Sequence, residues 1–288
     1  MRFLPLRLEC WGGLGSQLYA IALYLELRTK FPNKPISVRA HTAGITRREQ
    51  EISILDLVPN LQFVDDFAKE STKKTKLSSK IYRQIFFSIR KLIRFFIAKT
   101  PFFANLDNRI IRKSDCLLLN VRGHYSYRIL DAAGVSLILD SIMRLNIERI
   151  IEPENNVLTL HWRLGDLTEL KLNSMIDSKT IQLLLEKFLL SSYDRLEIFS
   201  DSPELVREIF PQRIAIPYVI HKVNAFEVIY NCIQSNTFVG TNSKISVWII
   251  IFRSLLFPNK NNAIPEGLRK TIIQNLISIN PKPNLYFY

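Results

Sequence analysis

The first part of the chain alternates short apolar runs with a longer helical pattern. Leu6 to Glu9 reads as a strand, and Gln17 to Lys30 carries apolar residues at helical spacing. Pro32 and Pro35 end that helix and precede a second strand-like run, Ile36 to Arg39. Repeated strand–helix units predict a parallel sheet covered by helices, which places the chain in the α/β class.

The same alternation resumes after Pro153. Strands are predicted at Val157 to Trp162, Leu196 to Phe199 and Thr237 to Gly240. The helices predicted between and after them are 179–190, 203–209, 225–235, 246–256 and 265–279. We therefore expect two α/β domains, 1–150 and 151–288, with the last helix able to pack back on the first domain.

Composition and charge narrow the class of protein. The 288 residues are 47% hydrophobic and 23% charged, which excludes a disordered chain, a collagen-like repeat and a bare coiled coil. The net charge of +13 predicts an anionic partner such as a nucleic acid, a membrane lipid or a phosphorylated substrate. Three scattered cysteines form neither a disulfide framework nor a zinc site. With no signal peptide or membrane span evident, we expect a cytoplasmic protein.

Residues 69–99 carry most of the positive charge. Their lysines and arginines outweigh a single acidic residue, Glu70, and give the segment a net charge of +9. From Ile81 onward the apolar residues share one broad helical face, with Arg83, Arg90 and Arg94 opposite. Such a helix suits the surface of an anionic membrane leaflet, and it equally suits a domain helix with its apolar face in the core. Nucleic-acid binding is disfavoured because the charge is concentrated here and no nucleic-acid motif accompanies it.

A glycine-rich turn joins the first predicted strand to the first helix. It contains Gly12, Gly13, Gly15, Ser16 and Gln17. Glycines there would let a ligand approach the backbone at a helix N-terminus, where an anion is favoured. The spacing matches neither a dinucleotide fingerprint nor a P-loop. A plain tight turn is the alternative interpretation.

The second half places polar residues at the carboxyl ends of its strands, where ligands bind in open α/β sheets. His161 and Arg163 alternate with Trp162 at the end of the first of these strands, so both would face one side. A guanidinium there could clamp a diphosphate through two parallel hydrogen bonds. The alternative is an ion pair between Arg163 and Asp166 that closes the loop.

The two following strand ends repeat this pattern. Asp201 and Ser202 come after the second strand, where Ser202 could equally cap the helix that begins at Pro203. Asn242 and Ser243 follow the third strand and precede a helix, a setting that suits a phosphate or a simple cap. Taken together, the three strand ends indicate one nucleotide-binding crevice.

The sequence shows no metal-ligand pattern at this crevice. There is no Asp-x-Asp, although a divalent cation on a sugar nucleotide normally needs clustered carboxylates. His41, His124 and His221 have no ligand spacing, and we expect them to be structural or surface residues. We therefore expect no metal, and neutralisation of the diphosphate by arginine and helix N-termini.

Four segments, in this order, resemble motifs of the α-1,2-fucosyltransferase family. They are residues 12–18, 161–166, 199–202 and 242–248, and a weaker likeness covers 123–126. Relative to the family motifs, Ser16 replaces an asparagine and Leu164 replaces a second arginine. The order and spacing match from residue 12 to about residue 256.

The resemblance implies a GT-B-like fold, in which two Rossmann-like domains face each other. It implies metal-independent, inverting transfer of fucose from GDP-fucose, without a cofactor, to a glycan hydroxyl through an α-1,2 linkage. It also implies a place in surface polysaccharide or O-antigen assembly, where the acceptor can be lipid-linked. The substitutions at Ser16 and Leu164 leave two alternatives open: a related transferase of other linkage or donor, and an inactive, membrane-associated member of the fold.

The resemblance also implies roles for individual residues. Arg163 would hold the diphosphate and stabilise the departing GDP, and Asp166 is a catalytic candidate beside Glu169 and Glu9 for the general base. The implied donor-binding residues are His161, Arg163, Asp201, Ser202, Asn242, Ser243 and Ser246. The glycine loop, with Gly13, Gly15, Ser16 and Gln17, would face the cleft from the other domain.

Overall fold

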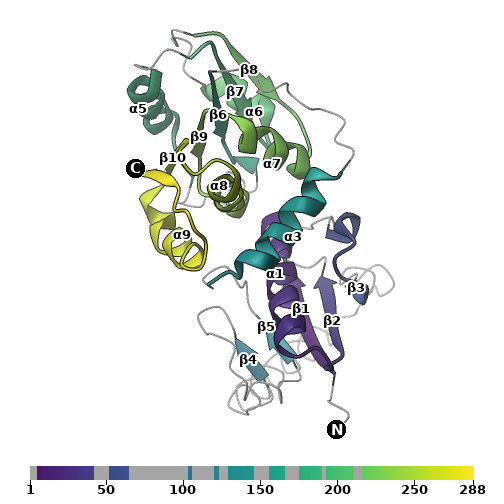
Figure 1. The fold of residues 1–288 in the computed structure, drawn as a ribbon. Coiled ribbons are helices and arrows are strands. Elements are labelled where there is room, and N and C mark those ends of the chain that lie inside the picture. Colours follow the sequence, from purple (N-terminus) through teal and green to yellow (C-terminus); the bar gives the residue numbers. More distant parts are fainter. Residues whose placement is uncertain are drawn as a thin grey trace, which may run out of the picture. The chain divides into compact units, whose positions relative to one another are not determined.

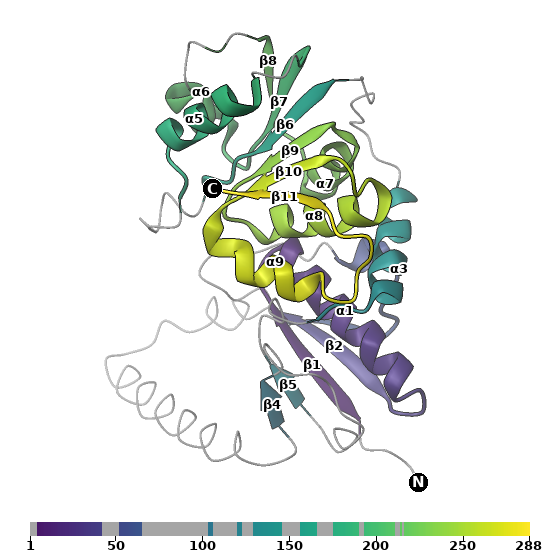
Figure 2. The same cartoon turned by 60° about the vertical axis from the view of Figure 1, so that its left-hand side comes forward.

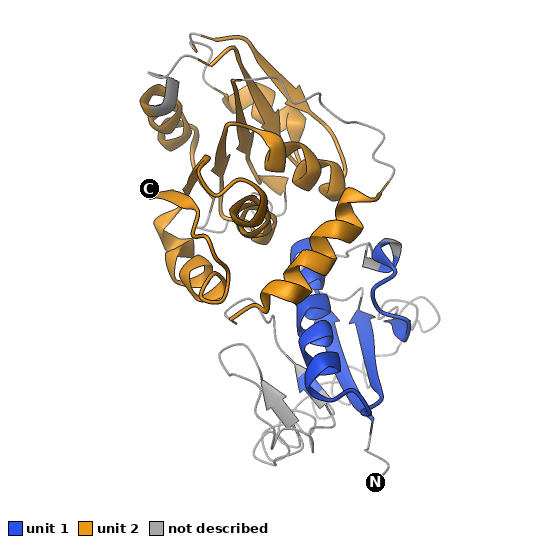
Figure 3. Cartoon of the chain, viewed as in Figure 1, with its two compact units in different colours: residues 1–128 blue, residues 129–288 orange. Residues whose placement is uncertain are grey.

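The computed structural model describes residues 5–41, 52–64, 103–105, 120–122, 129–145, 156–165, 175–189, 193–210, 214 and 216–288. They belong to two compact units, 1–128 and 129–288, each with its own parallel sheet (Figure 3). The basic segment 69–99 and Asp166 lie outside the described residues, so the expectations attached to them stay predictions.

Unit 1 has, among its described residues, a five-stranded parallel sheet in the order β3-β2-β1-β5-β4. The strands are β1 (Leu6–Trp11), β2 (Ile36–His41), β3 (Leu61–Val64), β4 (Phe103–Asn105) and β5 (Asn120–Arg122). Helix α1 (Leu14–Lys30) packs against β1 and β2 and buries most of its length there, beside the 3-10 turn η1 (Ile52–Leu55) (Figure 1).

The sheet of unit 2 has six parallel strands within the described part of the chain, in the order β11-β10-β9-β6-β7-β8. They are β6 (Val157–His161), β7 (Arg195–Phe199), β8 (Tyr218–His221), β9 (Thr237–Gly240), β10 (Asn261–Ile264) and β11 (Asn284–Phe287). Counted from β6, this is the 3-2-1-4-5-6 order of a Rossmann-type sheet. The order reverses between β6 and β9, which makes that junction the topological switch point.

Helices cover both faces of the second sheet. They are α3 (Ala132–Met143), α5 (Ser178–Leu189), α6 (Pro203–Ile209), α7 (Ala225–Gln234), α8 (Lys244–Leu256) and α9 (Arg269–Asn275), with a 3-10 turn η3 (Glu266–Leu268). Side chains of α5 and α6 share one buried apolar cluster with Leu158 and Leu160 of β6. On the other face lie α7 and α8, with α3 packed against both (Figure 2). None of the helices in the described ranges is both long and apolar enough to span a membrane.

The α/β class with two Rossmann-like domains is confirmed by these sheets. The division between units falls after Arg128 and not near residue 150, because α3 packs on α7 and α8 and so belongs to unit 2. The last predicted helix is shorter than expected. It is α9, which packs on α8, and it is followed by β11, a strand that the sequence pattern did not predict.

Candidate functional site

The switch point of unit 2 lies where β6 and β9 end side by side. The two strands are parallel neighbours, with His161 opposite Gly240 in the register. Residues 162–165 and residues 241–243 therefore leave the sheet at the same edge. Ligands of open α/β sheets bind at this position, outside the carboxyl ends of the strands.

Thr241 ties these two segments together. Its backbone N–H and its hydroxyl both donate to the carbonyl oxygen of His161, at 3.1 and 3.0 Å. The same Oγ1 accepts the backbone N–H of Arg163 at 3.0 Å. Because Thr241 is buried, water does not compete with these bonds, and they fix the backbone of both segments.

A second tie joins residues 163–165 to the end of β7. Asp201 Oδ1 accepts the backbone N–H groups of Leu164 and Gly165, at 2.9 and 3.1 Å. A Cβ at position 165 would lie 2.4 Å from Asp201 Oδ2, so a larger residue there would force the carboxylate to move. Asp201 therefore holds the loop that carries Arg163, whereas its contact with guanine or ribose stays a prediction.

Arg163 lies between two core residues. Trp162 and Leu164 are both 0% exposed and pack in the apolar cluster shared with α5 and α6, whereas Arg163 is half-buried. Leu164 stands where the fucosyltransferase motif has its second arginine. In this backbone that position fills the core.

His161 carries no charge at physiological pH. Its ring is buried, and Nδ1 shares a 2.8 Å hydrogen bond with Ser246 Oγ. Burial, and then the positive charge of Arg163, lower the pKa of His161 to about 3. Arg163 is thus close enough to His161 to act on it electrostatically, and the structure brings these two predicted site residues together.

The N-terminus of helix α8, which is its positive end, lies at the same edge of the sheet. Asn242 is half-buried just before the cap residue Ser243, whose Oγ accepts the N–H of Ile245 at 3.1 Å. Lys244 is the first helical residue, and the first turn contains no acidic side chain. A lysine here adds to the positive end of the helix dipole, which favours an anion at this position.

Two residues predicted to bind the sugar-nucleotide donor form hydrogen bonds with other groups of the protein. Ser246 is 0% exposed, its hydroxyl is engaged with His161, and a Cβ on Gly240 would lie 2.7 Å from its Cβ. Ser202 stands at the cap position of α6, but its side chain makes no cap bond, and its N–H donates to Ser200 Oγ at 3.1 Å. Ser246 therefore orients His161, and its contact with a phosphate stays a prediction.

The glycine-rich turn of unit 1 opens α1. Gly12 has a φ of +93°, and a Cβ there would lie 3.0 Å from Ser16 Oγ, so the turn requires glycine. Gly13 is the N-cap residue, and Gly15 and Ser16 are buried in the first turn. Gln17 is fully buried and donates from Nε2 to the carbonyl oxygen of Gly12 at 2.9 Å. Gln17 thus fixes the conformation of the turn, and the role of this loop in a cleft stays a prediction.

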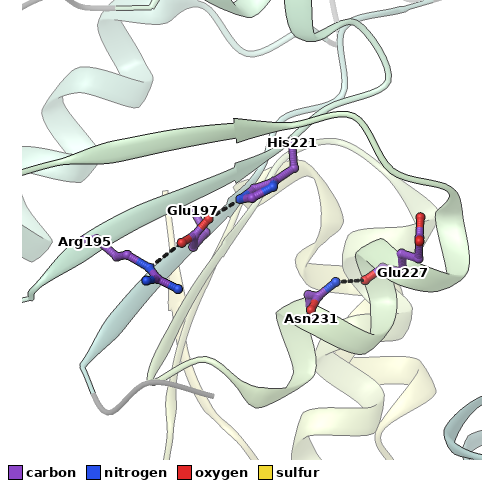
Figure 4. Close-up of polar contacts among 5 residues, drawn as sticks. All are labelled: Arg195, Glu197, His221, Glu227 and Asn231. Carbon is purple, nitrogen blue, oxygen red and sulfur yellow. Dashed lines mark hydrogen bonds and ion pairs between the residues drawn. The ribbon is translucent and has the colours of Figure 1, made fainter. Parts of the chain in front are cut away.

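Two histidines that the sequence assigns to the structural or surface class are bonded to buried glutamates. His41 Nε2 lies 2.7 Å from Glu9 Oε2 in unit 1, and His221 Nε2 is bonded to Glu197 in unit 2 (Figure 4). Each glutamate lies two residues before the aromatic residue that ends its strand. Each histidine ends the neighbouring strand. Strand register, which the sequence does not state, creates both pairs.

Arg253 is a further residue whose role sequence reasoning missed. It is 0% exposed in the middle of α8, and its Nε donates to Asn262 Oδ1 at 2.6 Å. Its Nη1 donates, at 3.0, 2.9 and 2.8 Å, to the carbonyl oxygens of Cys232, Ile233 and Ser235. Arg253 therefore caps the C-terminal end of α7. Burial lowers the pKa of its guanidinium to about 10, so it stays charged.

The charges at the switch point suit an anion. Arg163, Lys244 and the start of α8 are cationic, and His161 is neutral. Within the described ranges no three His, Cys, Asp or Glu side chains gather into a group that could hold a metal ion. The arrangement can bind a phosphate or diphosphate through a guanidinium and backbone N–H groups.

Comparisons with known proteins find likenesses of fold. No protein-family model matches the chain, and no curated protein matches it in sequence. The solved structures it resembles include the E. coli heptosyltransferase WaaC with ADP-2-deoxy-2-fluoro heptose (9% identity, 99% of this chain and 93% of that chain, TM-score 0.48). They also include POFUT1 in complex with GDP (10% identity, 92% and 98%, TM-score 0.42). A third is the E. coli ADP-heptose LPS heptosyltransferase II (11% identity, 98% and 90%, TM-score 0.45).

Proposed function

We propose that unit 2 binds the diphosphate of a sugar nucleotide at the switch point between β6 and β9, and that the chain is a glycosyltransferase. The observation that carries this proposal is the meeting of Arg163 and the start of α8 at two strand ends bound together by Thr241. An arginine holds a diphosphate through paired, charge-assisted hydrogen bonds, and a helix start adds backbone N–H groups. Lys244 adds a second positive charge.

The same groups suit the chemical step. The bond between the sugar C1 and the diphosphate oxygen breaks as the acceptor oxygen bonds to C1 from the opposite face, which inverts that carbon. The transition state resembles an oxocarbenium ion, and negative charge grows on the departing diphosphate. Fixed positive groups at that oxygen stabilise it most effectively. A general base takes the proton of the acceptor hydroxyl, and Asp166 is our candidate, with Glu169 and Glu9 as alternatives.

The four motif resemblances support a finer proposal. The donor is GDP-fucose, the transfer needs no metal, and the product is an α-1,2-linked glycan of a surface polysaccharide or O-antigen. A lipid-linked acceptor would fit contact between the basic segment 69–99 and an anionic membrane leaflet. A related donor or linkage, and an inactive member of the fold, are the alternatives that the experiment must separate.

A panel of nucleotides tests the proposal. Thermal unfolding of the purified chain is followed with GDP, ADP, UDP and GDP-fucose in buffer containing EDTA. Binding to the native state raises the midpoint, by about 2.7 kcal/mol of stability at a hundredfold excess over Kd, so a shift of several degrees is expected for GDP and GDP-fucose. No shift with any nucleotide contradicts the proposal. Binding without turnover, measured as GDP release with glycan acceptors, identifies the inactive alternative.

A further inference from the structure

His221 lies on the same edge of the sheet as the switch-point site. In the register of the second sheet, His161 of β6 is opposite Phe199 of β7, and Phe199 is opposite His221 of β8. These three residues form one row across the carboxyl ends of the strands. Neighbouring strands are about 4.8 Å apart, so His221 stands roughly 10 Å from His161 along that edge.

The ring of His221 is held in a fixed orientation. Its Nε2 is bonded to Glu197 of the neighbouring strand, and Figure 4 shows the ring directed from the end of β8 toward that carboxylate. Phe199 stacks on the ring at 5.0 Å between centroids and 20° between planes. Glu197 is buried, whereas 22% of the His221 side chain is exposed. The ring therefore combines a locked position with access to solvent.

Glu197 sets the tautomer of this histidine. Its other oxygen, Oε1, forms an ion pair with Arg195 (Figure 4). A carboxylate only accepts hydrogen bonds, so the ring proton must reside on Nε2. In the neutral form of the ring with its proton on Nε2, Nδ1 carries the lone pair. Within the described part of the chain, Nδ1 makes no hydrogen bond.

A nucleoside attached to a diphosphate at the switch point extends along the strand ends. In Rossmann-type sheets the ribose lies toward the end of the second strand, where a carboxylate receives its hydroxyl. The second strand here is β7, where the Oδ1 of Asp201 already accepts two backbone N–H groups. The third strand, β8, offers His221 as the next acceptor in the same direction.

We propose that His221 is a specificity-determining residue that accepts, at Nδ1, a hydrogen bond from the nucleoside half of the donor. The bond can come from a ribose hydroxyl or from an N–H group of the base. This inference rests on the proposed sugar-nucleotide site. It assigns Arg163 and the start of α8 to the diphosphate, and His221, held by Glu197, to the nucleoside.

Unit 1 supplies a matched control. Glu9, Trp11 and His41 repeat the same arrangement, with a 2.7 Å contact between His41 Nε2 and Glu9 and a ring stack at 4.6 Å. His41→Phe therefore makes a chemically equivalent change in the unit that lacks the β6–β9 site. It should not alter the relative affinity for nucleotides.

The test compares GDP with pyrophosphate, which lacks the nucleoside, by isothermal titration calorimetry. His221→Phe keeps the ring stack on Phe199 but removes the acceptor, so GDP affinity should fall roughly tenfold while pyrophosphate affinity stays within about twofold. His221→Asn places an amide oxygen near the position of Nδ1 and should recover most of the loss. Arg163→Ala should instead weaken both ligands.

Glu197→Gln gives a readout that a merely structural histidine would not produce. The amide oxygen is favoured beside Arg195, which leaves the NH₂ group to donate to His221 Nε2. The ring proton then moves to Nδ1, and the acceptor is lost although the ring stays in place. We expect the same selective loss of GDP affinity as in His221→Phe, and no such loss in His41→Phe.

Each outcome decides the inference. Selective loss of GDP affinity in both variants supports it, and titration with 2′-deoxy-GDP then distinguishes the sources. If the donor is the 2′-hydroxyl, His221→Phe costs nothing further with that ligand; if it is another group, the loss is unchanged. Unaltered GDP affinity, or equal loss of GDP and pyrophosphate, overturns the inference while the proposed function stands. A wild-type chain that binds no nucleotide overturns both.

Discussion

Thr241 Oγ1 donates a 3.0 Å hydrogen bond to the carbonyl oxygen of His161, and this bond connects the ends of β6 and β9. The same oxygen accepts the backbone N–H of Arg163. The arginine that we assign to the diphosphate is therefore positioned through its backbone by a residue from the opposite side of the switch point. Preorganisation of this kind lets a charged group act without reorganising when the ligand arrives.

Thr241→Val tests this link. Valine has the shape of threonine without the hydroxyl, so the Arg163 N–H loses its acceptor and the loop can shift. We expect about 1–3 kcal/mol of lost stability and a GDP affinity reduced roughly tenfold, measured by urea unfolding and calorimetry. Thr159→Val is the control. Its hydroxyl shares a buried 2.8 Å hydrogen bond with that of Ser235 at the end of α7, so stability should fall while GDP affinity is retained. Equal affinities in the two variants would contradict the positioning role.

Gly165→Ala should disrupt the loop that carries Arg163. The added methyl group would lie 2.4 Å from Asp201 Oδ2, so the carboxylate must move and its bonds to two backbone N–H groups weaken. We expect a stability loss on the order of 2 kcal/mol together with weaker GDP binding. Gly267→Ala meets no atom within 4 Å and should change neither quantity. If Asp201→Ala in the Gly165→Ala background restores no stability, the clash is not the cause.

The protonation of His161 predicts how stability depends on pH. Its pKa is lowered from 6.5 to about 3 in the folded chain. Between these two pH values His161 is therefore protonated in the unfolded chain and neutral in the folded chain. Stability contributed by the neutral ring is therefore complete above pH 6.5 and is lost as the pH falls toward 3, by at most about 1.4 kcal/mol per pH unit.

Urea unfolding at several pH values between 7 and 4 measures this slope. His161→Gln keeps a polar partner for Ser246 but cannot titrate, so its stability should fall less steeply than that of the wild type. Parallel curves for the two proteins would show that His161 is not held neutral by burial.

Arg253→Met should be among the most damaging single changes in α8. Methionine fills much of the same volume, but it leaves the carbonyl oxygens at the end of α7 and the Asn262 side chain without their donor. Several unsatisfied buried acceptors should cost on the order of 4 kcal/mol in the free energy of unfolding. Arg269→Met, which removes an exposed ion pair with Glu266, should cost much less, because solvent screens that pair. Similar losses in the two variants would argue against the cap.

Part of the architecture of unit 2 could be predicted from the sequence, because β6, β7, β9 and the helices after them carry local signals. The apolar run at 157–162, the Ser202-Pro203 start and the cap at Ser243 all follow from neighbouring residues. The strand β11 and the place of α3 depend on packing between distant segments, and no local pattern encodes them. Helical periodicity shows which residues form a helix, but it does not show which elements that helix packs against.

The candidate site divides in the same way. Residues at strand ends, such as Arg163 and Ser243, could be predicted because strand ends are recognisable in the sequence. The pairs formed across strands could not, since the contact between Glu197 and His221 depends on a register that only the folded sheet defines. Leu164 is the opposite case. Its place in the motif suggests a functional residue, but in the structure its side chain is buried in the core.

The most direct measurement of the central claim is a titration of GDP into wild-type and Arg163→Ala protein, in buffer with EDTA. Hydrogen bonds to charged groups are worth about 1.5–3 kcal/mol each, so the variant should bind GDP roughly ten- to a hundredfold more weakly. Its unfolding midpoint should stay close to that of the wild type, because Arg163 is half-buried beside the core and not part of it. GDP binding that is equally tight in both proteins would contradict the account.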